Sequence, residues 1–230
     1  SGFCLRDADT TDFKITNTPY GKDILVQYVD ALRRQGIAVG LYYSPEDFAW
    51  LYRDGHEVCR RGPGLLNPDE HPEYGRFVEA QVTELFTRFG KIDMLFIDGI
   101  GEKTTKQTCW ALQPDCLITR GEIETPEQFV PGRPPEGPWE SNLTMGTQWQ
   151  YKPTHDDYKS GTRILELLIE TRAKGGSMML NIGPKPNGEV PIEQESRLRE
   201  VALWHAVNHE CIHDTRPWVV SNEENIWFTG

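Results

Sequence analysis

The stretch Lys91-Ile-Asp-Met-Leu-Phe-Ile-Asp-Gly-Ile100 is an apolar run that ends in a carboxylate and a glycine. Its centre, residues 94–97, predicts a strand buried on both faces, as in a parallel sheet that helices cover. Gly99 lets the backbone turn away, so we expect Asp98 at the carboxyl end of the strand, where α/β sheets and barrels place their chemistry. Strand-Asp-Gly is also common turn chemistry, which leaves open that Asp98 only caps the following turn.

Helices alternate with apolar strands on both sides of this stretch. Apolar spacing predicts helices over 24–35, 71–89, 103–112, 158–174 and 192–208, and strands over 37–43, 116–119, 139–145 and 177–182. Residues 46–70 are expected to form a long irregular insertion, and residues 129–138, rich in Pro and Gly, a surface loop. This alternation predicts an α/β fold, best matched by one partial (β/α)8 barrel domain over 1–230 that lacks its first strands.

Composition restricts the classes of partner. The formal net charge of -11 and the pI near 5.0 argue against nucleic acids and anionic membranes, since both are polyanions. The sequence has neither an 18-residue apolar window nor the basic-then-apolar layout of a signal peptide. Seven Trp and eight Tyr suit a carbohydrate site, where rings stack on apolar sugar faces, although most of them are expected in the core.

Several other kinds of site lack their motifs. Neither GxGxxG nor GxxxxGK[ST] is present, which argues against nucleotide binding, and no GxSxG elbow appears. His205 and His209 share a helix face, but no HExxH motif and no third ligand accompany them, so we predict no metal site. The five cysteines are an odd number without CxxC; Cys109 and Cys116 could bridge locally, with burial as small hydrophobes the alternative.

Acidic residues at predicted strand ends are the candidates for chemistry: Asp98, Glu140, and Glu122 or Glu124. Hydrolysis of a glycosidic bond needs two carboxyl groups, one to protonate the leaving oxygen and one to attack or to activate water. Asp98 and Glu140 are about two β-α units apart, so a barrel could bring both into one mouth. We expect Trp139 to desolvate Glu140 and so raise its pKa toward that of a general acid. The alternative is that Glu140 is a solvated rim residue.

Seven ordered sequence blocks carry a resemblance to a known family over nearly the whole chain. The chain resembles the catalytic domain of the α-L-fucosidases of glycoside hydrolase family 29. The blocks are Gly2-Phe-Cys-Leu5 with Asp7, Asn17-Thr-Pro-Tyr-Gly-Lys-Asp23, Gly40-Leu-Tyr-Tyr-Ser-Pro45, Phe96-Ile-Asp-Gly99, Thr125-Pro-Glu-Gln128, Trp139-Glu140, and Leu180-Asn-Ile-Gly-Pro184 with Asn187-Gly-Glu-Val-Pro191.

The resemblance implies retaining hydrolysis of terminal α-L-fucose in a (β/α)8-like barrel, without a metal or organic cofactor. Asp98 matches the family's nucleophile, and Glu140 matches the Trp-Glu position that supplies the acid/base in many members, with Glu122 and Glu124 in reserve. The implied partner is a fucosylated glycan, and the implied compartment is secreted or periplasmic, or lysosomal in a eukaryote. Side chains expected to bind substrate are those of Tyr43, Phe96, Arg120, Trp139 and Trp149.

The sequence departs from the family pattern at three places. The usual His-His pair before the Gly-Phe block is absent, Phe96 replaces a common Trp, and no β-sandwich sequence follows. We therefore expect a segment of a longer protein. The departures leave open a catalytically impaired sugar-binding or scaffold relative, or a retaining glycosidase of altered sugar preference. Asn142-Leu-Thr144 is formally a glycosylation sequon, and its nearness to Glu140 indicates coincidence.

Overall fold

The computed structural model describes residues 2–59, 62, 64–120 and 123–230 of the chain. These residues divide into two compact units, Ser1–Glu122 and Ile123–Gly230. The sequence predicts one domain over 1–230, and this stays a prediction. Within the described ranges, every helix is too short or too polar to cross a membrane.

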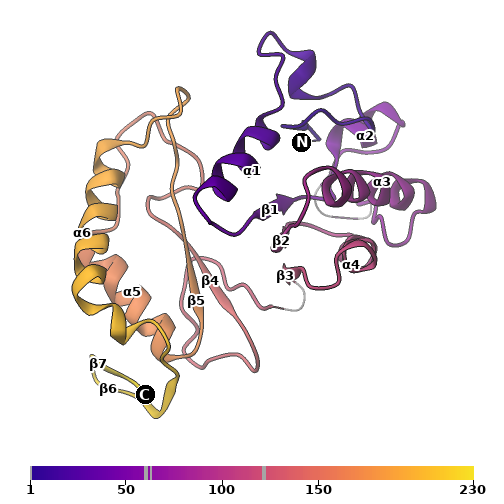
Figure 1. Cartoon of the computed structure of the whole chain (residues 1–230). Helices are drawn as coiled ribbons and strands as arrows, with labels where there is room; N and C mark the ends of the chain where they lie inside the picture. Colours follow the sequence, from indigo (N-terminus) through magenta and orange to yellow (C-terminus); the bar gives the residue numbers. More distant parts are fainter. Residues whose placement is uncertain (1, 60–61, 63, 121–122) are drawn as a thin grey trace. The chain divides into compact units, whose positions relative to one another are not determined.

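A parallel sheet is the centre of the first unit (Figure 1). It contains β1 (Gly40–Tyr43), β2 (Met94–Ile97) and β3 (Leu117–Thr119) in that spatial order. The register pairs Tyr42 with Phe96 and Phe96 with Thr119. Leu95, Phe96 and Ile97 are buried, which confirms the predicted buried strand in a parallel sheet.

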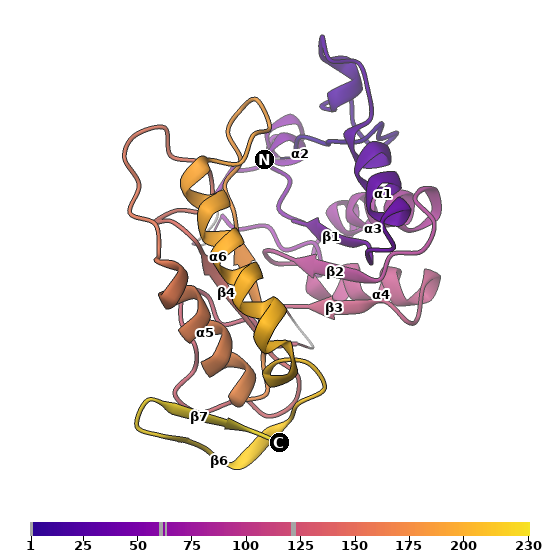
Figure 2. The same ribbon diagram turned by 60° about the vertical axis from the view of Figure 1, so that its left-hand side comes forward.

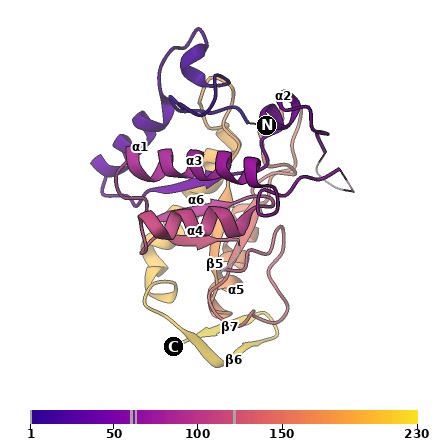
Figure 3. The same ribbon diagram turned by 90° about the vertical axis from the view of Figure 1, so that its right-hand side faces the viewer.

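Three long helices share a core with one face of this sheet. They are α1 (Ile24–Arg34), α3 (Pro72–Arg88) and α4 (Glu102–Leu112), and Figure 3 shows α3 and α4 side by side. Their inward residues Val29, Val78 and Cys109 join Leu95 and Ile97 in one apolar cluster. Because side chains alternate along a strand, the opposite face carries Phe96 and the residues in register with it.

The predicted irregular insertion is partly wrong, because it contains a helix. This helix is α2 (Phe48–Arg53), and it begins where the Asp47 side chain accepts the Trp50 N–H at 2.8 Å. Earlier in the unit, residues Ile15–Asn17 form the short helical turn η1. Trp50 is 7% exposed and stacks on Tyr74 with ring centroids 4.5 Å apart. Six residues are too few for apolar periodicity to reveal, so only the Asp cap signalled this helix.

The second unit is built around another parallel pair, β4 (Glu140–Thr144) and β5 (Ser177–Asn181). The chain passes between them through α5 (Gly161–Ala173), and Figure 2 shows α6 (Ile192–Asn208) beside α5. On the other edge of β4 the Glu140 N–H donates to the Glu124 carbonyl at 2.8 Å. The unit ends with η2 (His209–Cys211) and an antiparallel hairpin of β6 (Pro217–Glu223) and β7 (Ile226–Thr229).

The α/β class and the order of elements are as predicted. All five predicted strands form parallel pairs, with β1 beginning three residues later than expected. The strands in the described part of the chain do not form a closed barrel. Cys109 and Cys116 are free and buried rather than bridged.

Candidate active site

Asp98 follows β2 directly, and its N–H donates to the Tyr43 carbonyl at 3.0 Å, which continues the ladder. Its carboxylate Oδ1 accepts a hydrogen bond from Arg120 Nη1 at 2.6 Å, and Oδ2 accepts one from the Tyr42 hydroxyl. The helix that follows is capped instead by Asp69, whose carboxylate accepts the N–H of Thr104 at 2.8 Å. The alternative in which Asp98 only caps the turn is therefore wrong.

Arg120 is held in an unusual backbone conformation beside Asp98. It follows β3 immediately, and its φ of 60° lies in the left-handed region that non-glycine residues seldom occupy. Its guanidinium lies 5.8 Å from the centre of the Phe96 ring, and the ion pair is one-third exposed (Arg120 33%, Asp98 32%). Such backbone strain concentrates at functional sites, where the surrounding structure holds the residue in place.

Tyr42 is a site residue that the sequence analysis missed. Its ring stacks on Phe96 with centroids 5.7 Å apart, and its side chain is 62% exposed. The expected sugar contact, Tyr43, points to the opposite face, is 8% exposed and donates its hydroxyl proton to Gln81 Oε1 at 2.9 Å. The missed signal was strand alternation, which puts Tyr42 on the face of Phe96 and Asp98. Sugar binding by Tyr43 stays a prediction, without support from this placement.

Two glycines shape the turn after Asp98. Gly99 and Gly101 have φ angles of 117° and 93°, which side-chain-bearing residues seldom adopt. A Cβ at Gly99 would lie 2.8 Å from Glu46 Oε1, and one at Gly101 would lie 2.9 Å from Pro68 Cγ. The backbone therefore packs closely against two other segments, which fixes where Asp98 leaves the strand.

Glu140 is the first residue of β4 in the second unit, so it lies at the amino end of its strand, whereas Asp98 follows the carboxyl end of β2. Its environment is also different. Its side chain is half-buried, and Oε1 is inaccessible and has no hydrogen-bond partner among the described residues. Burial raises the pKa of the Glu140 carboxyl, because desolvation disfavours the charged form. This environment contradicts the alternative of a solvated rim residue and suits a carboxyl group that carries a proton.

Trp139 and Trp149 are the other predicted site residues of this unit. Trp139 is buried and donates its indole N–H to the Lys174 carbonyl at 3.3 Å. Its ring packs so closely on Gly176 that a Cβ added to this glycine would lie 2.5 Å from the ring. Neighbours in a strand point to opposite faces, so this geometry does not support Trp139 as the group that desolvates Glu140. Trp149 is exposed in a loop, where its sugar contact stays a prediction.

Glu124 and Glu122 are the reserve candidates for the acid/base. Glu124 is exposed beside β4, and Glu122 lies outside the described residues.

A second residue missed from the sequence is Asn142, which is 1% exposed and has no partner for either amide atom in the described part of the chain. It shares the strand face of Glu140, and its burial agrees with a coincidental sequon.

His205, one of the two histidines considered for a metal site, pairs with His213 rather than with His209. His205 Nε2 lies 2.8 Å from His213 Nε2, and both belong to the second unit. Across the ranges that the structure describes, His, Cys, Asp and Glu side chains nowhere gather in threes as metal ligands would.

Comparison with known proteins identifies the family. The family model for α-L-fucosidase matches residues 1–210. The structure of α-L-fucosidase isoenzyme 1 from Paenibacillus thiaminolyticus is similar with a TM-score of 0.83 and 32% identity, covering 100% of this chain and 63% of that one. The tissue α-L-fucosidase of Mus musculus is 34% identical over 90% of this chain and 50% of its own length.

The plasma α-L-fucosidase of Rattus norvegicus is 31% identical over 91% of this chain and 50% of its own length. The chain thus spans about half the length of the curated relatives that it matches. The family match covers both units, including the strands that carry Asp98 and Glu140. By these similarities, the chain belongs to the α-L-fucosidase family.

Proposed function

We propose that this protein is a retaining exo-α-L-fucosidase in which Asp98 is the nucleophile and Glu140 the acid/base. The observation that carries the proposal is the contrast between the two carboxyl groups, Asp98 directly after the carboxyl end of β2 and Glu140 at the first residue of β4. Asp98 is bound by a cation and a hydroxyl donor, whereas Glu140 is half-buried and has a raised pKa. A double displacement requires this division, because one group attacks as the anion while the other delivers a proton.

In the first step, an oxygen of Asp98 attacks the anomeric carbon of fucose as the glycosidic C–O bond breaks. The proton of Glu140 goes to the leaving oxygen, which departs as an alcohol, and a fucosyl ester of Asp98 forms. In the second step, Glu140 removes a proton from water, which attacks the same carbon and releases fucose and the Asp98 carboxylate. Hydrogen bonds from Arg120 and Tyr42 orient the Asp98 carboxylate in both steps.

We further propose that both units belong to one (β/α)8 barrel. The parallel strand pairs and the similarity to the Paenibacillus enzyme support this architecture. A retaining mechanism requires the two carboxyl groups to stand roughly 5 Å apart in the complete site. Phe96 and Arg120 would then face the sugar together with Tyr42, and Trp149 would contribute from its loop.

The proposed substrate is a terminal α-L-fucose on a fucosylated oligosaccharide or glycoconjugate. The net charge of -11 argues against a nucleic acid or an anionic membrane as the partner and does not affect a neutral sugar. We propose that the protein acts in a secreted or periplasmic compartment, or in lysosomes if it is eukaryotic, and that the reaction uses only side chains of the protein.

The proposal is tested by replacing Asp98 with Gly and measuring release of 4-nitrophenol from 4-nitrophenyl α-L-fucoside. We expect a loss on the order of 10³-fold or more in kcat. Azide should restore part of the turnover, because it fits the space left by the carboxylate and yields fucosyl azide of inverted configuration. Asp115→Gly is the matched control, since Asp115 is exposed just before β3.

Unchanged turnover by Asp98→Gly would overturn the assignment of the nucleophile. A panel of 4-nitrophenyl glycosides separates the remaining possibilities. Hydrolysis of another sugar in preference to fucose would indicate an altered specificity, and binding of fucose without turnover of any glycoside would indicate a sugar-binding relative.

A further inference from the structure

A pair of histidine side chains joins the end of α6 to the segment that leads into the β6–β7 hairpin. His205 lies in the last turn of α6, and His213 follows η2. Their Nε2 atoms are 2.8 Å apart, and the two rings are nearly perpendicular at 89°. His213 is exposed, and His205 is half-buried. Both histidines belong to the second unit and have no part in the double displacement, so a role for them is independent of that reaction.

The segment that carries His213 is held by hydrogen bonds to the backbone. Its N–H donates to the His209 carbonyl at 2.9 Å, and the Ile212 N–H donates to the same carbonyl at 3.0 Å. Arg172 of α5 donates from Nε to the Ile212 carbonyl at 3.0 Å and from Nη2 to the Thr215 carbonyl. These contacts bring the two imidazole groups together before any ligand binds, and such preorganisation favours binding.

The two rings share one proton across their contact. A neutral imidazole has one nitrogen that donates and one that accepts, so one Nε2 donates to the other. Within the described ranges neither Nδ1 has a hydrogen-bond partner, so the donating ring can move its proton to Nδ1 without breaking another bond. Both Nε2 lone pairs are then free, and neutral imidazole nitrogen is the commonest metal ligand in proteins.

The spacing of the two nitrogens selects the kind of metal ion. Metal–nitrogen bonds of about 2.0 to 2.1 Å, drawn from nitrogens 2.8 Å apart, meet at roughly a right angle. A right angle fits the square-planar or tetragonal geometry of Cu²⁺ and Ni²⁺, whereas tetrahedral Zn²⁺ needs a wider separation. Mg²⁺ and Ca²⁺ prefer oxygen ligands. The net charge of -11 attracts every cation, so the two nitrogens supply the selectivity.

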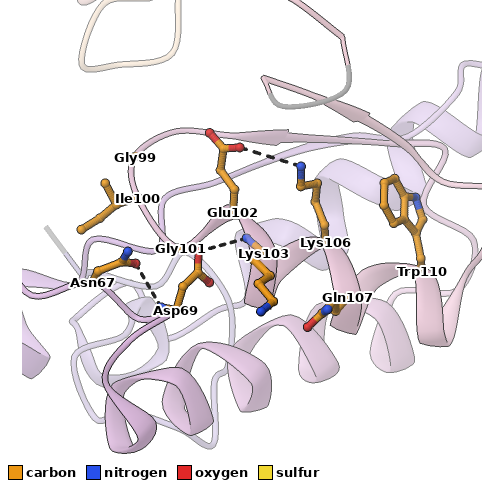
Figure 4. A pocket seen from close by; sticks show the side chains of 10 residues that line it. All are labelled: Asn67, Asp69, Gly99, Ile100, Gly101, Glu102, Lys103, Lys106, Gln107 and Trp110. Atoms are coloured by element: carbon orange, nitrogen blue, oxygen red, sulfur yellow. Dashed lines mark hydrogen bonds and ion pairs between the residues drawn. The ribbon is translucent and has the colours of Figure 1, made fainter.

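The carboxylates of the groove along α4 are engaged with other groups and do not compete for such an ion (Figure 4). The Asp69 carboxylate accepts the N–H groups of Lys103 at 3.2 Å and Thr104 at 2.8 Å. Glu102 pairs with Lys106 at 3.9 Å along the helix. Each carboxylate therefore already has a cationic or N–H partner.

The first unit contains another pair of neighbouring histidines, which differs in its contacts. The ring centroids of His56 and His71 are 5.3 Å apart. However, His71 Nδ1 accepts the Tyr74 N–H as the cap of α3, and His56 Nε2 lies 3.6 Å from Asp54 Oδ2. One nitrogen of each ring is thus engaged elsewhere, so this pair is less suited to hold an ion between its rings.

We propose that His205 and His213 chelate a divalent transition-metal ion, Ni²⁺ or Cu²⁺, with water in the remaining coordination positions. The ion replaces the shared proton and links the end of α6 to the segment before the hairpin, which stabilises the second unit. The sequence motifs for metal sites could not reveal this pair, because eight residues separate the histidines and η2 interrupts the helical spacing.

Isothermal titration calorimetry of the whole chain with NiCl₂ tests the site. Ni²⁺ is the probe because Cu²⁺ oxidises thiols, and Cys211 is exposed close to His213. His205→Ala and His213→Ala should each weaken Ni²⁺ binding by at least about 10-fold, since even changes around a metal ligand cost 10- to 100-fold. His209→Ala is the matched control and should leave the affinity unchanged, because His209 is exposed on the same segment but lies outside the pair.

The variant His213→Gln separates a ligand from a purely structural role. Gln can still form a hydrogen bond with His205 but offers no imidazole nitrogen, so Tm without metal should stay as in the original protein. Ni²⁺ at one hundred times its Kd should raise the Tm of the original protein by about 5 to 10 °C and should not raise that of His213→Gln.

Three outcomes would overturn the proposal. Loss of Ni²⁺ binding in His209→Ala but not in His213→Ala would place the chelate along α6 instead. Displacement of Ni²⁺ by an equal concentration of Mg²⁺ would show that only the negative charge of the protein attracts the ion. Absence of Ni²⁺ binding to the unmodified protein would exclude the site altogether.

Discussion

The surroundings of Asp98 and of Glu140 differ in almost every respect. Asp98 is one-third exposed, and both of its carboxylate oxygens accept hydrogen bonds. Glu140 is half-buried, and one of its oxygens has no partner in the part of the chain that the structure describes. The first environment stabilises a negative charge and the second disfavours it. Two side chains of the same chemistry thereby become suited to opposite roles.

This difference shows that sequence position alone does not assign acid and base. Asp98 follows the carboxyl end of β2, two residues after Phe96, and Glu140 begins β4, next to Trp139. The contacts distinguish their roles, because donors and burial set whether a carboxyl group holds its proton. Variants that remove the donors to Asp98 or the carboxyl group of Glu140 test whether these contacts and this burial cause the difference.

The largest effect is expected from Glu140→Gln. We expect kcat/KM for 4-nitrophenyl α-L-fucoside to fall by about 10²- to 10⁴-fold, the usual contribution of general acid catalysis. A 2,4-dinitrophenyl leaving group needs little protonation, so its loss should be much smaller. Glu124→Gln serves as the matched control. If Glu124→Gln rather than Glu140→Gln shows this dependence on the leaving group, the acid/base assignment moves to Glu124.

Next in size is the effect of Arg120→Ala. Loss of a charge-assisted hydrogen bond to Asp98, worth about 1.5 to 3 kcal/mol, should lower kcat/KM by roughly 10- to 100-fold. Thermal stability should hardly change, because a partly exposed ion pair contributes only about 0 to 1 kcal/mol. Arg120→Lys should regain part of the activity but not all of it, since Lys keeps the charge without the fork geometry. A large fall in melting temperature would show that Arg120 supports the fold instead.

A matched pair of tyrosine variants tests the two faces of β1. Tyr42→Phe removes a donor to Asp98 and should lower kcat/KM about 3- to 10-fold without affecting stability. Tyr43→Phe removes the buried hydrogen bond to Gln81 and should lower the free energy of unfolding by about 1 to 3 kcal/mol without affecting kcat/KM. The reverse pattern would contradict the placement of the two side chains.

The smallest effect concerns the pH dependence of stability. The raised pKa of Glu140 means that the folded state holds this proton more tightly than the unfolded state, whose pKa is near the ordinary 4.5. The stabilisation is fully present below 4.5 and is lost as the pH rises through the folded-state pKa. Urea unfolding at pH 4 and pH 7 should show this loss, and Glu140→Gln should abolish it. Glu124→Gln should retain it.

Much of the fold could be predicted because its elements carry strong local signals. The apolar run at 94–97 could only be buried, and helices such as α6 repeat their apolar positions over several turns. The helix α2 was missed because six residues do not complete two turns. The antiparallel hairpin β6–β7 also depends on pairing between segments, which no single segment reveals.

The candidate site was less predictable, because side-chain direction matters there more than residue type. Two adjacent tyrosines in β1 gave no reason to prefer one, and the choice depended on the register that pairs Tyr42 with Phe96. The unpartnered amide of Asn142 is a product of packing and leaves no trace in the sequence.

The left-handed backbone of Arg120 has a consequence for directed evolution. Gly and Asn fit a φ of 60° most easily, but neither carries a positive charge, and Lys carries the charge but meets the same backbone cost as Arg. No natural amino acid offers both properties. A saturation library at this codon should therefore contain two kinds of variant: stable variants with little turnover, and active variants that are no more stable than the original protein. Improved enzymes would have to be sought at other positions.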